Sequence, residues 1–252
     1  MIYTFSKSNN YIVSFHQSFI LIDMRQVFLH GPKGRIEGII SNEDKEDTKS
    51  VAVLFHSHPD VGGSFEEENI QNLFNTLVKK NFITLAINFR GIGRSEGVFD
   101  NGIGELEDAS ACLDWVCANN LPCKNIWVCG FSFGSWITMQ IAMRRPEVKN
   151  FVAISPLIKK YDFSFFHPCN MRGIVLQGNL DSVSDVNDVS KFFSPIVEKK
   201  NKRIIYKIIH RGDHFMRNKE KELSEIIEDY IEVEKNVPDD VSLADKRTRQ
   251  KY

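Results

Sequence analysis

The sequence predicts an α/β fold: a doubly wound, mostly parallel sheet with helices on both faces. Short apolar runs alternate along the chain with longer segments whose apolar residues recur at helical spacing. The runs are apolar throughout rather than alternating, which is typical of parallel strands that are covered on both faces. The predicted strands are 51–55, 82–87, 126–129, 151–154, 173–176 and 204–209.

The segments between these runs are predicted to be helices. Ile70, Leu73 and Leu77 share one face at helical spacing, and similar apolar faces recur within 106–117, 186–197 and 223–231. Ahead of the first parallel strand, two apolar pieces at 27–29 and 36–40 are joined by a Gly-Pro-Lys-Gly turn. We therefore expect an N-terminal antiparallel hairpin. In such sheets, active sites lie at the carboxyl ends of the strands, so the loops there are the ones to search.

Length and charge limit the classes of function. A chain of 252 residues fits one domain, and 32 basic against 33 acidic residues leave a net charge of −1. No basic or acidic block favours nucleic acid or an anionic membrane, and no apolar stretch is long enough to cross a bilayer. We expect neither partner; the oligomeric state cannot be read from the sequence.

The chain divides into an extension (1–24), one α/β domain (25–235) and a charged tail without periodicity (236–252) that we expect to be flexible. The stretch 11–22 is moderately apolar but a poor signal peptide, and is expected to form a flexible extension or an additional edge strand. Domain-like patterning begins directly after Met24, which makes Met24 an alternative candidate for the start.

The cysteines are neither paired nor spaced like a disulfide framework or a zinc site. We expect reduced, mostly buried thiols, a cytoplasmic protein, and neither a metal nor a cofactor. The cysteines are Cys112, Cys117, Cys123, Cys129 and Cys169.

The segment after the strand 126–129 carries the strongest motif. It reads Gly-Phe-Ser-Phe-Gly at 130–134 and is followed by a helical stretch that Pro146 stops. A G-x-S-x-G sequence between a strand and a helix is typical of a nucleophile elbow, a strained turn that exposes the serine hydroxyl. Gly130 and Gly134 would remove side chains that collide with the neighbouring strand and helix. Ser132 is therefore the candidate nucleophile.

A serine hydroxyl needs a base, and the base needs an orienting acid, which follow it in the order acid, then histidine. Asp181 comes just after the strand 173–176, and His214 comes just after the strand 204–209. Both positions lie at carboxyl ends of predicted strands, so Asp181 and His214 are the candidate acid and base. The rival residues have other expected roles: N-capping for Asp185 and Asp188, a structural role for His210, and a solvated turn for Asp213.

The loop after the strand 51–55 occupies the position of a second oxyanion donor. The backbone N–H of Phe133 is the first candidate donor, the N–H of His58 is the second, and the N–H of Ser57 is the fallback. His56 and His58 also have His-x-His spacing, but a third metal ligand is not evident beyond Asp60.

The loop 88–97 contains Gly91 and Gly93 in G-x-G spacing, but its third glycine is misplaced for a dinucleotide-binding motif, because Glu96 stands at the position that the motif requires. A tight turn beneath the active site explains these glycines better. Arg90 and Arg94 could meet an anionic substrate group, although surface salt bridges are the default expectation.

Together these loops resemble the α/β-hydrolase superfamily. The stretches HGPKGRIEG, HSHPDVGGS, GFSFGSW and GDHF are similar to a group of small, uncharacterised bacterial serine hydrolases, over about 28–234. The resemblance implies Ser132 as nucleophile, Asp181 as acid and His214 as base. It departs at Ser57, where many members have glycine, and at Asn88, where an aspartate is common. The short connection between 154 and 172 leaves no room for a lid domain, which implies an open site.

The expected chemistry is hydrolysis of a small acyl ester, thioester or amide through an acyl-enzyme. A peptidase or amidase using the same residues, or a non-catalytic binding protein of this fold, remains an alternative. Core packing is the main expected role for the aromatic residues near the site, although they could also shape an acyl pocket. These residues are Phe131, Phe133, Trp136, Phe163, Phe165 and Phe166.

Overall fold

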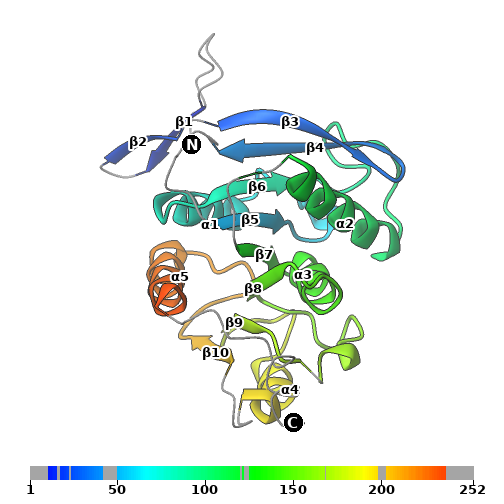
Figure 1. Cartoon of the computed structure of the whole chain (residues 1–252). Helices are drawn as coiled ribbons and strands as arrows, with labels where there is room; N and C mark the ends of the chain where they lie inside the picture. Colours follow the sequence, from blue (N-terminus) through cyan, green and yellow to red (C-terminus); the bar gives the residue numbers. More distant parts are fainter. Residues whose placement is uncertain are drawn as a thin grey trace, which may run out of the picture.

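A mostly parallel eight-stranded sheet forms the centre of the described chain (Figure 1). The computed structural model describes residues 11–15, 18–22, 24–41, 50–119, 121, 125–167, 169–197 and 203–236, with the backbone alone for 11–22. The strand order is β10-β9-β8-β7-β5-β6-β4-β3. The strands of this sheet are β3 (Met24–Gly31), β4 (Gly34–Ser41), β5 (Ser50–Phe55), β6 (Ile83–Ile87), β7 (Asn125–Phe131), β8 (Val148–Ile154), β9 (Arg172–Gly178) and β10 (Ile204–Ile209).

The expected N-terminal hairpin is confirmed. Strands β3 and β4 pair antiparallel and close with Gly31 opposite Gly34. Strand β4 also pairs antiparallel with β6, and the remaining pairings are parallel. The fold class predicted from the wholly apolar runs is therefore correct, because strands such as β5 are buried on both faces.

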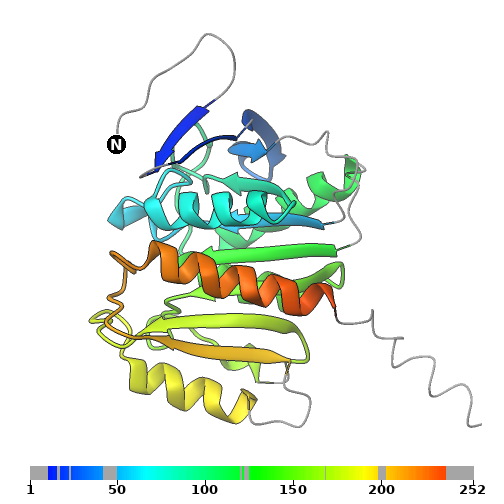
Figure 2. The same cartoon turned by 90° about the vertical axis from the view of Figure 1, so that its left-hand side faces the viewer.

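Helices cover both faces of the sheet, as Figure 1 shows edge-on and Figure 2 shows from one side. Helices α1 (Glu68–Lys79) and α5 (Glu220–Lys235) pack on one face. Helices α2 (Ile103–Ala118), α3 (Phe133–Arg144) and α4 (Val186–Val197) pack on the other. Alternate residues of β5 divide between the two layers: Val53 joins the α2–α4 layer, whereas Leu54 joins the α1–α5 layer. This packing fixes the strand ends that carry the candidate site.

Residues 11–22 contain strands β1 (Tyr11–Phe15) and β2 (Ser18–Ile22), which pair only with each other in a separate two-stranded sheet. Of the two alternatives expected for this stretch, the additional edge strand is wrong, because neither β1 nor β2 pairs with the edge strand β3. Helix α5 ends at Lys235, and the charged tail predicted from Asn236 onward lies outside the described residues except for Asn236 itself. None of the helices within the described ranges is long and apolar enough to span a membrane.

Candidate active site

Ser132 occupies the sharp turn between β7 and α3. Its backbone angles are φ 55° and ψ −113°, a conformation that is strained for a residue with a side chain. A Cβ atom at Gly134 would collide with the backbone carbonyl of Phe55, and one at Gly130 would collide with the carbonyl of Gly134. Both glycines of the motif are therefore required by the close approach of strand, turn and helix.

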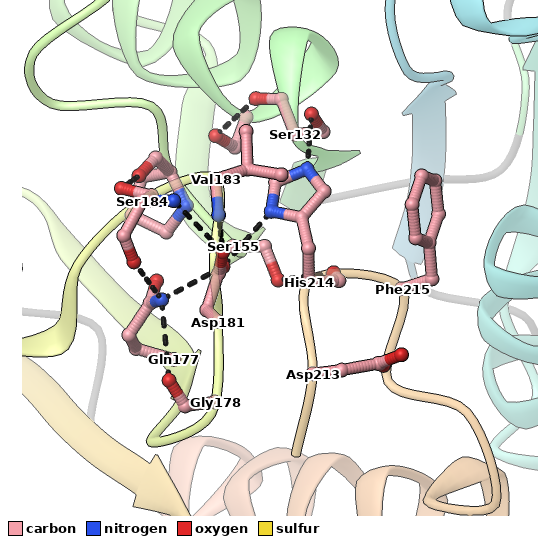
Figure 3. A network of polar contacts seen from close by, with 12 residues as sticks. Ser132, Ser155, Gln177, Gly178, Asp181, Val183, Ser184, Asp213, His214 and Phe215 are labelled. Atoms are coloured by element: carbon pink, nitrogen blue, oxygen red, sulfur yellow. Dashed lines mark hydrogen bonds and ion pairs between the residues drawn. The ribbon is translucent and has the colours of Figure 1, made fainter.

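A chain of hydrogen bonds joins Ser132, His214 and Asp181, which come from the ends of three different strands (Figure 3). The Oγ of Ser132 lies 2.9 Å from Nε2 of His214, and Nδ1 of His214 lies 2.8 Å from Oδ2 of Asp181. Because the carboxylate can only accept, Nδ1 carries the proton and Nε2 is left to accept from the serine. This is the arrangement that activates a serine hydroxyl.

Asp181 is held as a carboxylate by several donors. Its Oδ2 accepts from Gln177 as well as from His214, and its Oδ1 accepts the backbone N–H groups of Val183 and Ser184, each at 2.8 Å. Burial alone would raise the pKa of Asp181, but the hydrogen bond from His214 and the two backbone donors outweigh it and lower the pKa. The acid is therefore ionised at neutral pH.

Backbone contacts fix the loop that carries His214. The hydroxyl of Ser155 donates to the carbonyl of His214 at 2.9 Å, and the side-chain amide of Asn69 on α1 donates to the carbonyl of Phe215 at 2.9 Å. The ring of Phe131 lies 5.6 Å from the His214 ring. The loop that carries the imidazole is thus anchored to the end of β8 and to α1.

The loop after β5 lies against the turn that carries Ser132, since a Cβ at Gly134 would also meet the carbonyl of His56. Over the described residues, neither the N–H of His58 nor that of Phe133 donates to another protein group. The N–H of Ser57, by contrast, donates to Glu67 at 2.8 Å. Of the sequence-based alternatives, His58 rather than Ser57 therefore has its donor available.

His56 connects two strand ends. Its Nε2 accepts the backbone N–H of Phe89 at 3.0 Å, so Nδ1 carries the proton and donates to the carbonyl of Ser57 at 2.7 Å. Burial lowers the pKa of His56 to about 4, which keeps the ring neutral. Both ring nitrogens are occupied, and the described residues contain no cluster of three or more side chains suited to a metal.

Arg90 is buried rather than at the surface, contrary to expectation. It is 2% exposed and makes bidentate contacts with Asp108 on α2, at 3.0 and 2.7 Å. Through this pair it anchors the β6–α2 loop to α2. Arg94 is an exposed residue near Glu37, as expected.

The departure at Asn88 has a local explanation. Its amide donates to the buried carboxylate of Glu37 at 3.1 Å, and its Oδ1 accepts the N–H of Phe65. An aspartate at this position would repel Glu37.

The rival acids and histidine lie outside the hydrogen-bonded chain. Asp185 accepts the N–H of Asn187 ahead of α4, and Asp188 pairs with Lys159. Asp213 pairs with Arg217, and His210 is exposed just after β10. Asp185 thus has the capping contact expected of it and Asp213 lies in a turn region, whereas Asp188 lies within the first turn of α4 and pairs with Lys159 rather than capping the helix.

Access to Ser132 is narrower than the absence of a lid implied. The described part of the β8–β9 connection contains one short 3-10 helix (Ser164–Phe166) and no lid domain. Even so, Ser132 is 3% exposed and His214 is 5% exposed. Most of the aromatic residues singled out in the sequence are core residues, and only Trp136 and Phe165 are partly exposed.

Sequence reasoning missed Glu67 and Gln177, whose side chains contact the site from α1 and β9. A carboxylate just ahead of a helix has the pattern of a helix start, and a buried glutamine in a strand carries no motif. Neither position had a signal that distinguishes a supporting residue from a structural one.

Comparisons with known proteins agree with this fold. Residues 41–204 match the family model described as X-Pro dipeptidyl-peptidase (S15 family). An uncharacterized protein of Rickettsia prowazekii is 43% identical over 212 residues, which cover 82% of this chain and 89% of the relative.

Two solved structures are also similar. A protein of unknown function from Agrobacterium tumefaciens, described as a candidate α/β-hydrolase, is 39% identical with a TM-score of 0.79, over 84% of this chain and 96% of that one. An α/β serine hydrolase homologue from Coxiella burnetii is 27% identical with a TM-score of 0.74, over 84% and 99% of the two chains. The chain belongs to the α/β-hydrolase superfamily and, by its match to the family model, to the S15 family within it.

Proposed function

We propose that this hydrolase is a serine esterase that cleaves a small acyl ester or thioester through an acyl-enzyme. Ser132 is the nucleophile, His214 the general base and Asp181 the acid that orients the imidazole. The observation that carries the proposal is the continuous hydrogen-bonded chain from Ser132 Oγ through His214 to Asp181, with distances of 2.9 and 2.8 Å. Its geometry gives each group the partner that acyl transfer requires.

In the proposed cycle, His214 takes the proton of Ser132 as its oxygen attacks the acyl carbon. The negative charge on the carbonyl oxygen is stabilised by the N–H groups of Phe133 and His58. His214 then gives its proton to the leaving group, and a water molecule, activated by the same imidazole, hydrolyses the acyl-enzyme. The chemistry needs no cofactor and no metal, since the protein's own groups supply the nucleophile, base and oxyanion donors.

The test is labelling with a fluorophosphonate and hydrolysis of p-nitrophenyl acetate and butyrate, in wild-type protein and in Ser132→Ala. We expect labelling and turnover in the wild type and loss of both in the variant, because the probe reacts only with an activated serine. Ser135→Ala is the matched control, since Ser135 is buried one turn away and its hydroxyl donates to the carbonyl of Ser132. Well-folded wild-type protein that neither reacts nor turns over would favour a non-catalytic binding protein.

A peptidase is the second candidate, and the match to the S15 family favours it. The same hydrogen-bonded chain could cleave an amide, but a peptide N-terminus would need an acidic partner. The nearest acid of the oxyanion loop, Asp60, is largely exposed and lies 3.8 Å from the ring of His58. Comparing hydrolysis of p-nitrophenyl esters with that of an X-Pro p-nitroanilide separates the two candidates.

We also propose that residues 25–235 act as one catalytic domain on a small-molecule substrate, in the cytoplasm. The thiols of Cys112, Cys117 and Cys129 are free, as expected in a reducing compartment. Mapping of the fragment that survives limited proteolysis, and fractionation of cells that make the protein, check the domain and the location.

A further inference from the structure

Glu67 is a carboxylate that neither the fold nor the proposed chemistry explains. It stands at the N-cap position of α1, but its side chain makes no capping hydrogen bond there. Instead it reaches back to the loop after β5. One oxygen accepts the backbone N–H of Ser57 at 2.8 Å, and the other accepts the Ser57 hydroxyl at 2.6 Å.

These contacts complete a clamp around the peptide unit that joins Ser57 to His58. The carbonyl of Ser57 accepts from Nδ1 of His56, and a Cβ at Gly63 would collide with that carbonyl. The carbonyl of His58 accepts the N–H groups of Val61 and Gly63 at 3.1 and 3.2 Å. Because the carbonyls of Ser57 and His58 both accept hydrogen bonds, the backbone on either side of the His58 N–H is held in place. The N–H of His58 therefore has one fixed direction.

We propose that Glu67 is a positioning residue for hydrolysis: by binding both donors of Ser57, it holds the His58 N–H as an oxyanion donor. The inference rests on the proposed function, since an oxyanion hole matters only if Ser132 attacks a carbonyl. Preorganised donors contribute because they need not reorient as charge develops. Without Glu67, the Ser57 N–H and hydroxyl would lose their partners, and the loop could rotate away from the orientation that serves His58.

The clamp does not depend on the charge of Glu67. Burial raises the pKa of its carboxyl group to about 7, so both ionisation states are populated near neutral pH. The carboxylate accepts from both Ser57 donors; the neutral acid can accept from the N–H and donate to the hydroxyl oxygen. Glutamine offers the same acceptor and donor, so it should replace glutamate, whereas alanine should not.

The experiment compares kcat and KM for p-nitrophenyl acetate in wild type, Glu67→Ala and Glu67→Gln. We expect Glu67→Ala to lower kcat by about tenfold or more with KM changed less than about threefold, because the lost interaction acts in the transition state. Glu67→Gln should stay within about threefold of wild type. Glu66→Ala, at the exposed neighbouring glutamate, is the matched control and should behave as wild type.

A second control separates positioning from general stability. Tyr230→Phe removes a buried hydrogen bond to Asn150 that lies away from the oxyanion loop. It should lower the midpoint of thermal unfolding but leave kcat unchanged. If Glu67→Ala does not fold, Ser57→Ala removes the hydroxyl contact alone and should still lower kcat by about threefold or more.

The outcomes distinguish the two proposals. If turnover does not depend on Ser132, both the proposed function and this inference fail. If turnover depends on Ser132 but folded Glu67→Ala keeps the wild-type kcat, this inference alone is overturned. A loss in Glu67→Gln as large as that in Glu67→Ala would also overturn the clamp, because the hydrogen bonds would then not be what matters.

Discussion

The hydroxyl of Ser155 donates a hydrogen bond of 2.9 Å to the backbone carbonyl of His214. This bond ties the end of β8 to the loop that carries the imidazole. The N–H of Ser155 also donates to the carbonyl of Leu176, which links the same residue to β9. Ser155 holds this position at φ 51°, in the left-handed region that disfavours residues with a side chain. Ser155 therefore affects the stability of the folded protein in two opposite ways. Its hydrogen bond stabilises the fold, whereas its backbone angle destabilises it.

Two substitutions of Ser155 separate these contributions. Ser155→Ala removes the bond and keeps the strain, so it should lower the free energy of unfolding by about 1–3 kcal/mol and reduce kcat several-fold. Ser155→Gly removes the bond but relieves the strain, so its stability should lie within roughly 1 kcal/mol of wild type. Urea unfolding of the three proteins checks this. Equal destabilisation by alanine and glycine would show that the backbone angle costs nothing.

Gln177 supports Asp181 from inside the sheet. It is fully buried, and its Nε2 donates to Oδ2 of Asp181 and to the carbonyl of Ser184, each at 2.9 Å. Gln177→Met should lower kcat/KM about tenfold and stability by about 1–3 kcal/mol, because buried acceptors lose their donor. Steady-state kinetics and urea unfolding measure both effects.

Gln177→Glu sharpens this test. Its introduced carboxyl group would face Asp181, so the loss of activity should be larger at pH 8, where both groups are charged, than at pH 6. A loss that does not vary with pH would contradict the account of Gln177 as a donor to a carboxylate.

The sequence was enough to predict the three candidate catalytic residues, but not the residues that hold them and the neighbouring loop in place. Ser132, Asp181 and His214 could be predicted because each follows an apolar run, and the carboxyl ends of parallel strands meet at one edge of the sheet. The partners of Gln177 and Glu67 depend on how loops from different strands pack, which has no periodicity in the sequence. Arg90 was misassigned for the same reason, since its burial depends on Asp108 of α2 lying against the β6 loop.

The dependence of stability on pH should reflect two groups, Glu67 and His56, whose pKa values are shifted in opposite directions. Glu67 has its pKa raised to about 7 in the folded protein, so its contribution to stability is complete below about pH 4.5 and is lost as the pH rises towards 7. His56 has its pKa lowered to about 4, so its contribution is complete above about pH 6.5 and is lost as the pH falls towards 4. Between about pH 4.5 and 6.5, Glu67 therefore lowers the free energy of unfolding as the pH rises, whereas His56 raises it.

Glu67→Gln removes the first of these two effects. The free energy of unfolding of the variant should rise more steeply than that of wild type between pH 4.5 and 6.5. From below pH 4.5 to above pH 7, the free energy of unfolding of the variant should increase relative to that of wild type by roughly 3 kcal/mol. Urea unfolding at half-unit intervals of pH measures both curves; parallel curves would show that Glu67 has the same pKa in the folded and unfolded states.

The buried pair of Arg90 and Asp108 makes a prediction about stability alone. Arg90→Met leaves the Asp108 carboxylate, which is 1% exposed, without its bidentate partner, and should lower the free energy of unfolding by about 3–5 kcal/mol. Arg90→Lys should recover little of this loss, because an ammonium group cannot reproduce the two-pronged contact. Urea unfolding gives the loss. A change in KM for p-nitrophenyl esters in folded Arg90→Lys would contradict a purely structural role for Arg90.

Gly134 and Gly62 are both glycines near the proposed oxyanion hole, but they are required for different reasons. A Cβ at Gly134 would meet the backbone carbonyls of Phe55 and His56, which cannot move without displacing β5. Gly62 has open space around its Cβ position but adopts φ 83°.

Gly134→Ala should therefore destabilise the protein by about 3 kcal/mol or more and abolish esterase activity, because the nucleophile turn and the oxyanion loop are forced apart. Gly62→Ala should cost only about 1–2 kcal/mol of backbone strain and keep most of the activity. Thermal unfolding and p-nitrophenyl acetate hydrolysis compare the pair, and equal losses of activity would mean that strain, rather than close packing, governs the geometry of the oxyanion loop.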